Sequence, residues 1–249
     1  MLFIHFKSLF SFSFYRRLVQ LTTRQTLGFV AYLFFISVVI LFFFTGSVIH
    51  KNFPVFLKNF PQVTFEKGVL TAPEEPVYAP IPGTNFKIVF DASATVPPTN
   101  QELLDSNTLA WIHKNQMYVP STAGVQQQTV PANVSFTSTP EILEKYKSSL
   151  SASLRLTLLI VSLFFVALTL LMDFMLALGM ALFFNIFRRT RLPKAVLVKL
   201  AAFVLGPLTT LWLVRLWVDI PLFGLAQFIV CVIYMQQIFN AFAGGPREN

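Results

Sequence analysis

Residues 27–49 form a run of 23 residues without a charged side chain. A helix rises 1.5 Å per residue and the hydrocarbon core of a bilayer is about 30 Å thick, so about 20 apolar residues suffice to cross it. A cleaved signal peptide is the alternative, but its apolar region is normally about 7–15 residues long and ends in a small-x-small site. The present run is longer and ends in the letters TGSVI, a poor cleavage site. It therefore predicts a retained first transmembrane helix.

Three further apolar runs predict transmembrane helices over 154–187, 195–216 and 222–242. Within the first of them, the 32 residues 156–187 contain one charge, which is too short a run for two spans and a turn and predicts a single tilted or protruding helix. Gly206-Pro207 predicts a kink in the third span, because proline removes one backbone hydrogen bond. Charged residues make up only 12% of the chain, against about 25% in soluble domains, which excludes a water-soluble globule.

The first 26 residues form a separate basic segment. Lys7, Arg16 and Arg17 lie off a stripe of apolar residues that recurs at about helical spacing. The members of that stripe are Phe3, Phe6, Phe10, Phe14 and Leu18. The pattern favours an amphipathic helix in the membrane interface that is attracted to anionic lipid, and a disordered basic tail is the alternative.

The net charge of +8 is concentrated beside the apolar runs, in the N-terminal segment and in residues 188–199. Positive charge in these places is typical of the cytoplasmic flanks of membrane spans, and it argues against nucleic acid as a partner. Four spans place both termini on one side of the membrane. The sequence therefore predicts that the N-terminal segment and the tail 243–249 are cytoplasmic, and that residues 50–153 lie outside.

Residues 50–153 differ in kind, because they hold eight of the chain's eleven acidic residues. Glu66-Lys67-Gly68 predicts a hairpin turn between two of several short β-like runs. These runs are 63–65, 69–71, 86–90, 111–112 and 117–119. Residues 140–153 predict a helix that leads into the second span, with Thr139 as its N-cap. The predicted fold class is an α-helical integral membrane protein with four transmembrane helices and a small α+β extracytoplasmic domain between spans 1 and 2.

No catalytic or metal-binding motif occurs in the chain. The three histidines, His5, His50 and His113, are scattered, and no HExxH, CxxC, Walker-type or G-x-S-x-G sequence is present. Cys231 is the single cysteine, so no intrachain disulfide can form. The sequence therefore predicts no enzymatic activity, no catalytic residue, no cofactor and no metal.

Asp173 is the sharpest candidate for a functional residue in the membrane. An acid within a span costs about 2.5–3.5 kcal/mol on insertion scales, so it needs a partner or a wet cavity. It is expected to be neutral or to pair with Arg215, and it acts either as an interhelical clamp or as an ion, proton or substrate contact. Asn185 and Gln227 are candidates for hydrogen bonds between helices.

Asp91 is the candidate external contact, at the expected end of a strand. Together with Glu102 and Asp105 it could form an acidic site on the outer domain. The alternative is that these acids are simply solvated, as acids in exposed loops usually are.

Several segments together resemble a family of uncharacterised bacterial four-span inner-membrane proteins, a domain-of-unknown-function family in which some members are labelled maltodextrin utilisation proteins. They are the Phe-rich start with Tyr15-Arg16-Arg17, the outer segments FPVFLKNFPQVTFEKGVL and FKIVFDASA, and the run LPKAVLVKLAAFVLGP after the basic loop. The resemblance covers nearly the whole chain. It implies a bacterial cell membrane and a four-span layout, and it supplies no reaction.

Two classes of function follow from these observations. The favoured one is a non-enzymatic membrane accessory protein whose outer domain binds a membrane-protein partner. The alternative is a component of a small-solute transporter or channel that uses Asp173, and four spans would then require a homo-oligomer. In both cases the lipid bilayer surrounds the helices.

Overall fold

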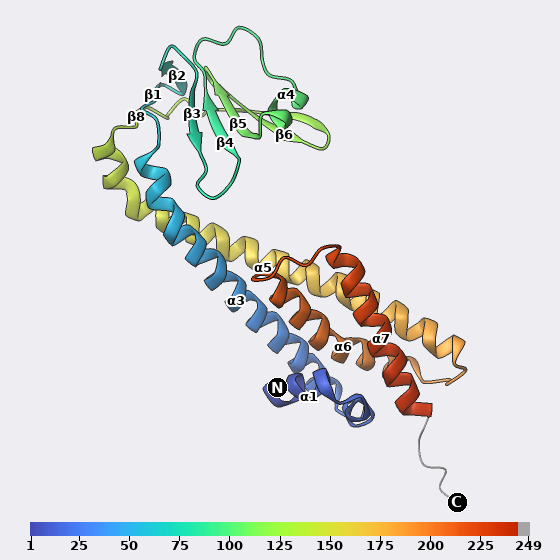
Figure 1. Ribbon diagram of the computed structural model, residues 1–249. Coiled ribbons are helices and arrows are strands. Elements are labelled where there is room, and N and C mark those ends of the chain that lie inside the picture. The colour runs from blue at the N-terminus through green and yellow to red at the C-terminus, as the bar shows by residue number, and fades with distance from the viewer. Residues whose placement is uncertain (244–249) are drawn as a thin grey trace, which may run out of the picture. The chain divides into compact units, whose positions relative to one another are not determined.

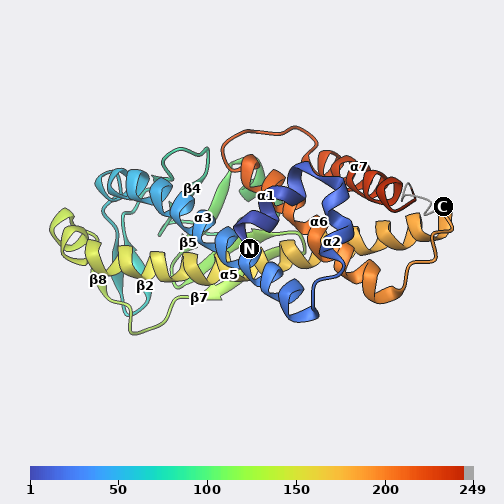
Figure 2. The ribbon, with the colours of Figure 1, turned by 90° about the horizontal axis from the view of Figure 1, so that it is seen from below.

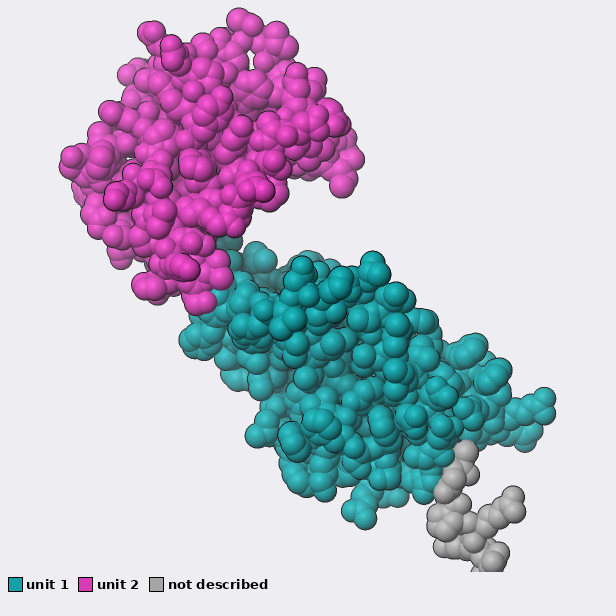
Figure 3. Space-filling model, viewed as in Figure 1, with its two compact units in different colours: residues 1–45, 157–249 teal, residues 46–156 magenta. Residues whose placement is uncertain are grey.

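The computed structural model describes residues 1–243. The chain divides into two compact units, which Figure 3 colours separately. One is a helical unit built from residues 1–45 and the chain from residue 157 onward, and the other, residues 46–156, is a β domain.

Four helices are long and apolar enough to cross a membrane, as the sequence predicts, and they make the chain a multi-pass membrane protein. They are α3 (Thr23–Lys58), α5 (Pro140–Phe187), α6 (Lys194–Arg215) and α7 (Phe223–Ala243) (Figure 1). Helix α5 is one continuous helix that includes residues 140–153. Thr139 stands at its start, where its Oγ1 accepts a hydrogen bond from the Ile142 backbone N–H at 3.4 Å.

Helix α3 is longer than predicted. The sequence places the end of the first span at residue 49, whereas the helix continues through Pro54 to Lys58. Its last turn is held by the β domain, because Phe56 packs against the apolar core of that domain together with Phe60. The predicted domain 50–153 therefore begins with a helical segment, which its high content of polar residues did not indicate.

Helix α6 is the centre of the helical unit. Its apolar segment is 67% buried, against 22–28% for the other three helices. It is continuous through Pro207. The other helices bury one stripe each and leave large apolar side chains exposed, which is expected of helices whose outer faces meet lipid.

The N-terminal segment is not one amphipathic helix. It consists of α1 (Leu2–Phe10), the short 3₁₀ helix η1 (Phe12–Phe14) and α2 (Tyr15–Leu18), and the chain is extended at Ser11. Figures 1 and 2 show α1 and α2 beside α6. The predicted apolar stripe is therefore split: Phe3, Phe6 and Phe10 are exposed, whereas Leu18 is buried in the core.

The β domain contains two sheets. The smaller has the strand order β2-β1-β8, with β1 (Thr64–Glu66), β2 (Val69–Ala72) and β8 (Phe136–Thr137). The larger has the order β3-β4-β5-β6-β7. Its strands are β3 (Val77–Pro80), β4 (Lys87–Phe90), β5 (Thr108–His113), β6 (Gln116–Ser121) and β7 (Gly124–Thr129). Neighbouring strands in this sheet are antiparallel, with one exception. Strands β4 and β5 are parallel, and α4 (Asn100–Asp105) lies in the connection between them.

The predicted hairpin turn is confirmed. Glu66 pairs with Val69, and the two residues between them, Lys67 and Gly68, have φ angles of 52° and 80°. Positive φ at both positions is the geometry of a two-residue type I′ hairpin turn. A Cβ on Gly68 would also lie 2.6 Å from the Pro131 carbonyl oxygen, so only glycine fits.

Candidate functional site

Asp173 lies on the buried stripe of α5 and is 5% exposed. The buried residues of this helix recur every three or four positions, which places them on one face. They are Ser162, Val166, Leu170, Asp173, Ala177, Ala181 and Phe184. The sequence therefore places an acidic residue on the face of α5 that is buried in the bundle.

One oxygen of the Asp173 carboxyl group has a partner. Gln227 on α7 donates a hydrogen bond from Nε2 to Asp173 Oδ1. Arg215 does not pair with Asp173; its guanidinium lies 4.5 Å from the centre of the Phe223 ring. Of the two states expected for Asp173, the pair with Arg215 is therefore not formed, because Arg215 at the end of α6 lies against Phe223 at the start of α7. Asn185, the other residue expected to link helices, instead bonds Thr190 and Leu192 in the loop after its own helix.

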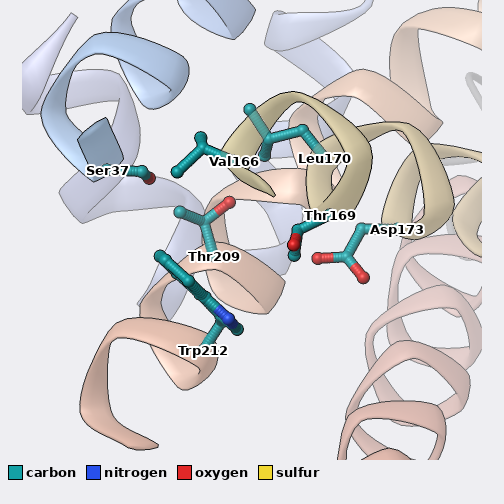
Figure 4. Close-up of a pocket in the computed structure, with 7 residues that line it drawn as sticks. All are labelled: Ser37, Val166, Thr169, Leu170, Asp173, Thr209 and Trp212. Atoms are coloured by element: carbon teal, nitrogen blue, oxygen red, sulfur yellow. The ribbon is translucent and has the colours of Figure 1, made fainter. Parts of the chain in front are cut away.

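The other carboxyl oxygen of Asp173 belongs to a buried cluster of unpaired side-chain oxygens. Three buried oxygens there have no hydrogen-bond partner: Asp173 Oδ2, Ser37 Oγ and Thr209 Oγ1. Asp173, Ser37 and Thr209 are among the residues that line a cavity of about 10 Å³ between α3, α5 and α6, and the free surface of this cavity is apolar. Figure 4 shows Thr209 between Ser37 on one side and Asp173 on the other. A volume of about 10–15 Å³ is the least that holds one water molecule, so the cavity has room for at most one water and is too small for a solute.

A second polar cluster joins α1 to α3 and α6. His5 Nε2 lies 2.9 Å from Thr210 Oγ1 and 3.3 Å from the Gly206 carbonyl oxygen, and His5 Nδ1 lies 3.4 Å from the Tyr32 hydroxyl. The Thr210 hydroxyl gives its single hydrogen to the Gly206 carbonyl oxygen, so toward His5 its Oγ1 can only accept a hydrogen bond. His5 Nε2 must therefore carry a proton. Nδ1 then accepts from Tyr32. Burial lowers the pKa of His5, against the hydrogen bond to Gly206, which raises it.

The N-terminal segment is fastened to the bundle by further polar contacts. Tyr234 on α7 donates to the Leu9 carbonyl at 2.6 Å, and Lys199 on α6 donates to the Val19 and Leu21 carbonyls at 3.1 and 2.6 Å. Gly206 allows this close approach, since a Cβ there would lie 2.8 Å from Ser8 Oγ. No pattern in the sequence indicated this docking.

Asp91 follows β4 directly, at the strand end where the sequence places it. It is buried, and its Oδ1 accepts hydrogen bonds from the Ser93 N–H, the Ser93 hydroxyl and the Ala94 N–H. This oxygen therefore shapes the turn after the strand. Glu102 also has a structural role, because with Thr99 it forms the capping box at the start of α4, and this bonding lowers the pKa of Glu102.

Asp91 and Glu102 nevertheless share an open groove of about 460 Å³ on the larger sheet. Its floor is a cross-strand row, because Tyr78 pairs with Val89 and Val89 with Trp111. Lys87 lies beside this row with its ammonium 4.8 Å from the Tyr78 ring centre. The opposite face of the sheet, which includes Ala79 and Phe90, is buried in the domain core. The groove thus combines aromatic rings with charges of both signs.

Among residues 1–243, no group of three or more histidine, cysteine, aspartate or glutamate side chains is placed to hold a metal ion. The predicted absence of an enzymatic activity stays a prediction.

A family model described as a protein of unknown function, DUF1189, matches residues 4–239. The chain belongs to this family. The match runs from α1 to α7 and so includes the N-terminal segment, the β domain and all four apolar helices. No curated protein and no solved structure matches the chain. The expected membership of a family of unknown function is confirmed, whereas the match does not bear on the maltodextrin label and names no activity.

Proposed function

We propose that this DUF1189 protein is a non-enzymatic accessory protein of the bacterial inner membrane whose β domain binds a membrane-protein partner outside the cytoplasm. Both termini then lie in the cytoplasm. The basic residues between α5 and α6 support this orientation, because positive charge in short loops marks the cytoplasmic side. They are Arg188, Arg189 and Arg191, and Lys194 follows as the first residue of α6.

The groove of about 460 Å³ carries the proposal. Tyr78 is 54% exposed although it belongs to a strand of the larger sheet, and the indole Nε1 of Trp111 is buried without a hydrogen-bond partner. An exposed aromatic side chain beside a second aromatic ring whose donor is unused is typical of surfaces that another molecule covers. By contrast, the pocket at Asp173 holds at most one water in this conformation.

The test is affinity purification of the full chain from native membranes in mild detergent, followed by mass spectrometry. The double variant Tyr78→Ala/Lys87→Glu changes the groove, and Lys145→Glu on the exposed start of α5 is the matched charge control. A partner retained by the wild type and the control but lost by the groove variant is the expected result. Retention of the same partner by all three proteins would show that the groove does not bind it.

The second candidate function is a component of a small-solute transporter or channel. The unpartnered Asp173 Oδ2 favours it, since a buried carboxyl oxygen without a donor calls for a bound water, proton or ion. Flux into liposomes that contain the purified protein tests this function. Asp173→Asn keeps the shape and an oxygen for Gln227 but removes the ionisable group. Transport that survives this substitution would rule out Asp173 as the coupling site.

A further inference from the structure

A groove of about 880 Å³ opens between α3, α5 and α6 in the helical unit. The polar members of its lining are Thr23, Thr26 and Lys199, which all belong to the first turns of α3 and α6. Farther along, the lining is apolar and includes Phe34, Leu170 and Leu205. The groove therefore has one polar end and an apolar body.

The length of the groove matches one leaflet of a bilayer. Eleven residues separate Thr23 from Phe34 on α3, which corresponds to about 16 Å of helix. The hydrocarbon core is about 30 Å thick, so the groove reaches about halfway across it. A transmembrane helix of a partner would need a groove along the whole thickness, whereas an acyl chain from one leaflet needs only half.

The polar end of the groove is basic. Lys199 Nζ donates to two carbonyl oxygens, those of Val19 and Leu21, and an ammonium group has a third N–H to give. Arg24 and Lys194 stand next to the lining residues Thr23 and Ala195, and both are exposed. In the described part of the chain the single ion pair is Lys147–Glu144, so no carboxylate neutralises these cations.

We propose that this leaflet groove binds one anionic phospholipid, with an acyl chain along its apolar body and the phosphate at Lys199, Arg24 and Lys194. Basic pockets between membrane helices bind anionic headgroups in this way. The inference rests on the helical unit alone and is independent of the function proposed for the β domain. It requires only that the basic end of the bundle lies at a membrane surface.

The binding experiment uses the full-length protein purified in mild detergent and native mass spectrometry, with phosphatidylglycerol as the probe and phosphatidylcholine as the uncharged comparison. We expect one phosphatidylglycerol per chain and much weaker retention of phosphatidylcholine. The double variant Arg24→Gln/Lys194→Gln should weaken phosphatidylglycerol binding by roughly thirtyfold, since each basic residue near a headgroup contributes about a fivefold factor. Arg155→Gln, which removes a basic residue outside the groove, should leave it unchanged.

Filling the groove gives a second, steric test. Ala31 and Ala167 line the groove and are exposed, so Ala31→Trp and Ala167→Trp should block the acyl chain without overpacking the core. Leu168→Trp, one residue away and outside the lining, is the control. If a tryptophan variant does not give a monodisperse protein, the double variant Arg24→Gln/Lys194→Gln alone tests the proposal.

Three outcomes would overturn the proposal. Equal retention of the two lipids would show that the basic end does not select a headgroup. Displacement of phosphatidylglycerol by inorganic phosphate at equal concentration would show a site for free anions in which the acyl chain has no part. Loss of an oligomer or of a bound protein in Ala31→Trp, with lipid retention unchanged, would assign the groove to a partner helix.

Discussion

The helical unit contains two polar clusters that differ in one respect. Around His5, the ring nitrogens, the Tyr32 and Thr210 hydroxyls and the Gly206 carbonyl bond to one another. Around Asp173, one carboxyl oxygen is bonded by Gln227, while Asp173 Oδ2 and the hydroxyls of Ser37 and Thr209 have no partner. Thr209 and Thr210 are neighbours on α6, so a single turn of helix serves both clusters.

The two clusters differ in whether their buried polar atoms have hydrogen-bond partners. A buried polar group with its bonds made adds specificity and stability, whereas one without a partner costs about 1–3 kcal/mol and persists where something else requires it. The His5 cluster ties α1 to the bundle. The Asp173 cluster links α5 to α7 through Gln227 and leaves one carboxyl oxygen unpaired.

The largest effect is expected from Gly206→Val. Its side chain would collide with Ser8 Oγ, 2.8 Å from the position of a Cβ, and with His5 and Phe29. Overpacking of this kind typically costs about 1–3 kcal/mol. Unfolding in detergent measures the loss. Gly179→Val on α5 is the matched control, because no atom lies within 4 Å of a Cβ there. Equal losses in the two variants would mean that α1 does not dock at Gly206.

A smaller effect is expected from Thr210→Val, which removes the acceptor of the His5 Nε2–H and the donor to Gly206 O. Hydrogen bonds between membrane helices are worth about 0.6–2 kcal/mol, so a loss of about 1 kcal/mol should appear in the same unfolding assay. Thr209→Val is the neighbouring control. It removes a hydroxyl without a partner and should be neutral or slightly stabilising. A cost equal to that of Thr210→Val would mean that Thr209 bonds a water in the cavity.

The smallest effect concerns pH. Burial lowers the pKa of His5 and outweighs the hydrogen bond to the Gly206 carbonyl, so the folded protein favours the neutral imidazole. A base with a lowered pKa contributes stability above its unfolded pKa of about 6.5, and this stability is lost as the pH falls below that value. Unfolding measured from pH 8 to pH 5 should show the loss, and His5→Gln should remove it. His50→Gln, at an exposed histidine, should not.

The local parts of the fold were predictable. The four spans follow from long apolar runs, and the hairpin at Glu66-Lys67-Gly68 follows from turn residues between β-like runs. The start of α5 follows from Thr139 as a cap. The order of strands in the larger sheet was not predicted, because parallel pairing of β4 with β5 joins segments that have no local pattern in common. Helix α4 was missed although Thr99 and Glu102 have the spacing of a capping box.

The candidate site was predicted in part. Asp173 was recognisable as the one charged residue in an apolar run, and Gln227 was a candidate for a hydrogen bond between helices. Their pairing was not foreseen, since 54 residues separate them and Arg215 offered a more obvious charge. Gly206-Pro207 predicted a kink, while in the structure Gly206 leaves the space in which α1 packs.

The sequence by itself determined that this chain spans a membrane several times and carries a β-containing domain between its first two spans. Hydropathy and turn chemistry act over a few residues, and they need no knowledge of the rest of the chain. Only the tertiary structure decided which faces meet: that α6 lies at the centre, that His5 reaches Thr210, and that Asp173 faces Ser37 and Thr209 across a water-sized cavity. These contacts depend on packing between segments far apart in sequence, and no local pattern encodes it.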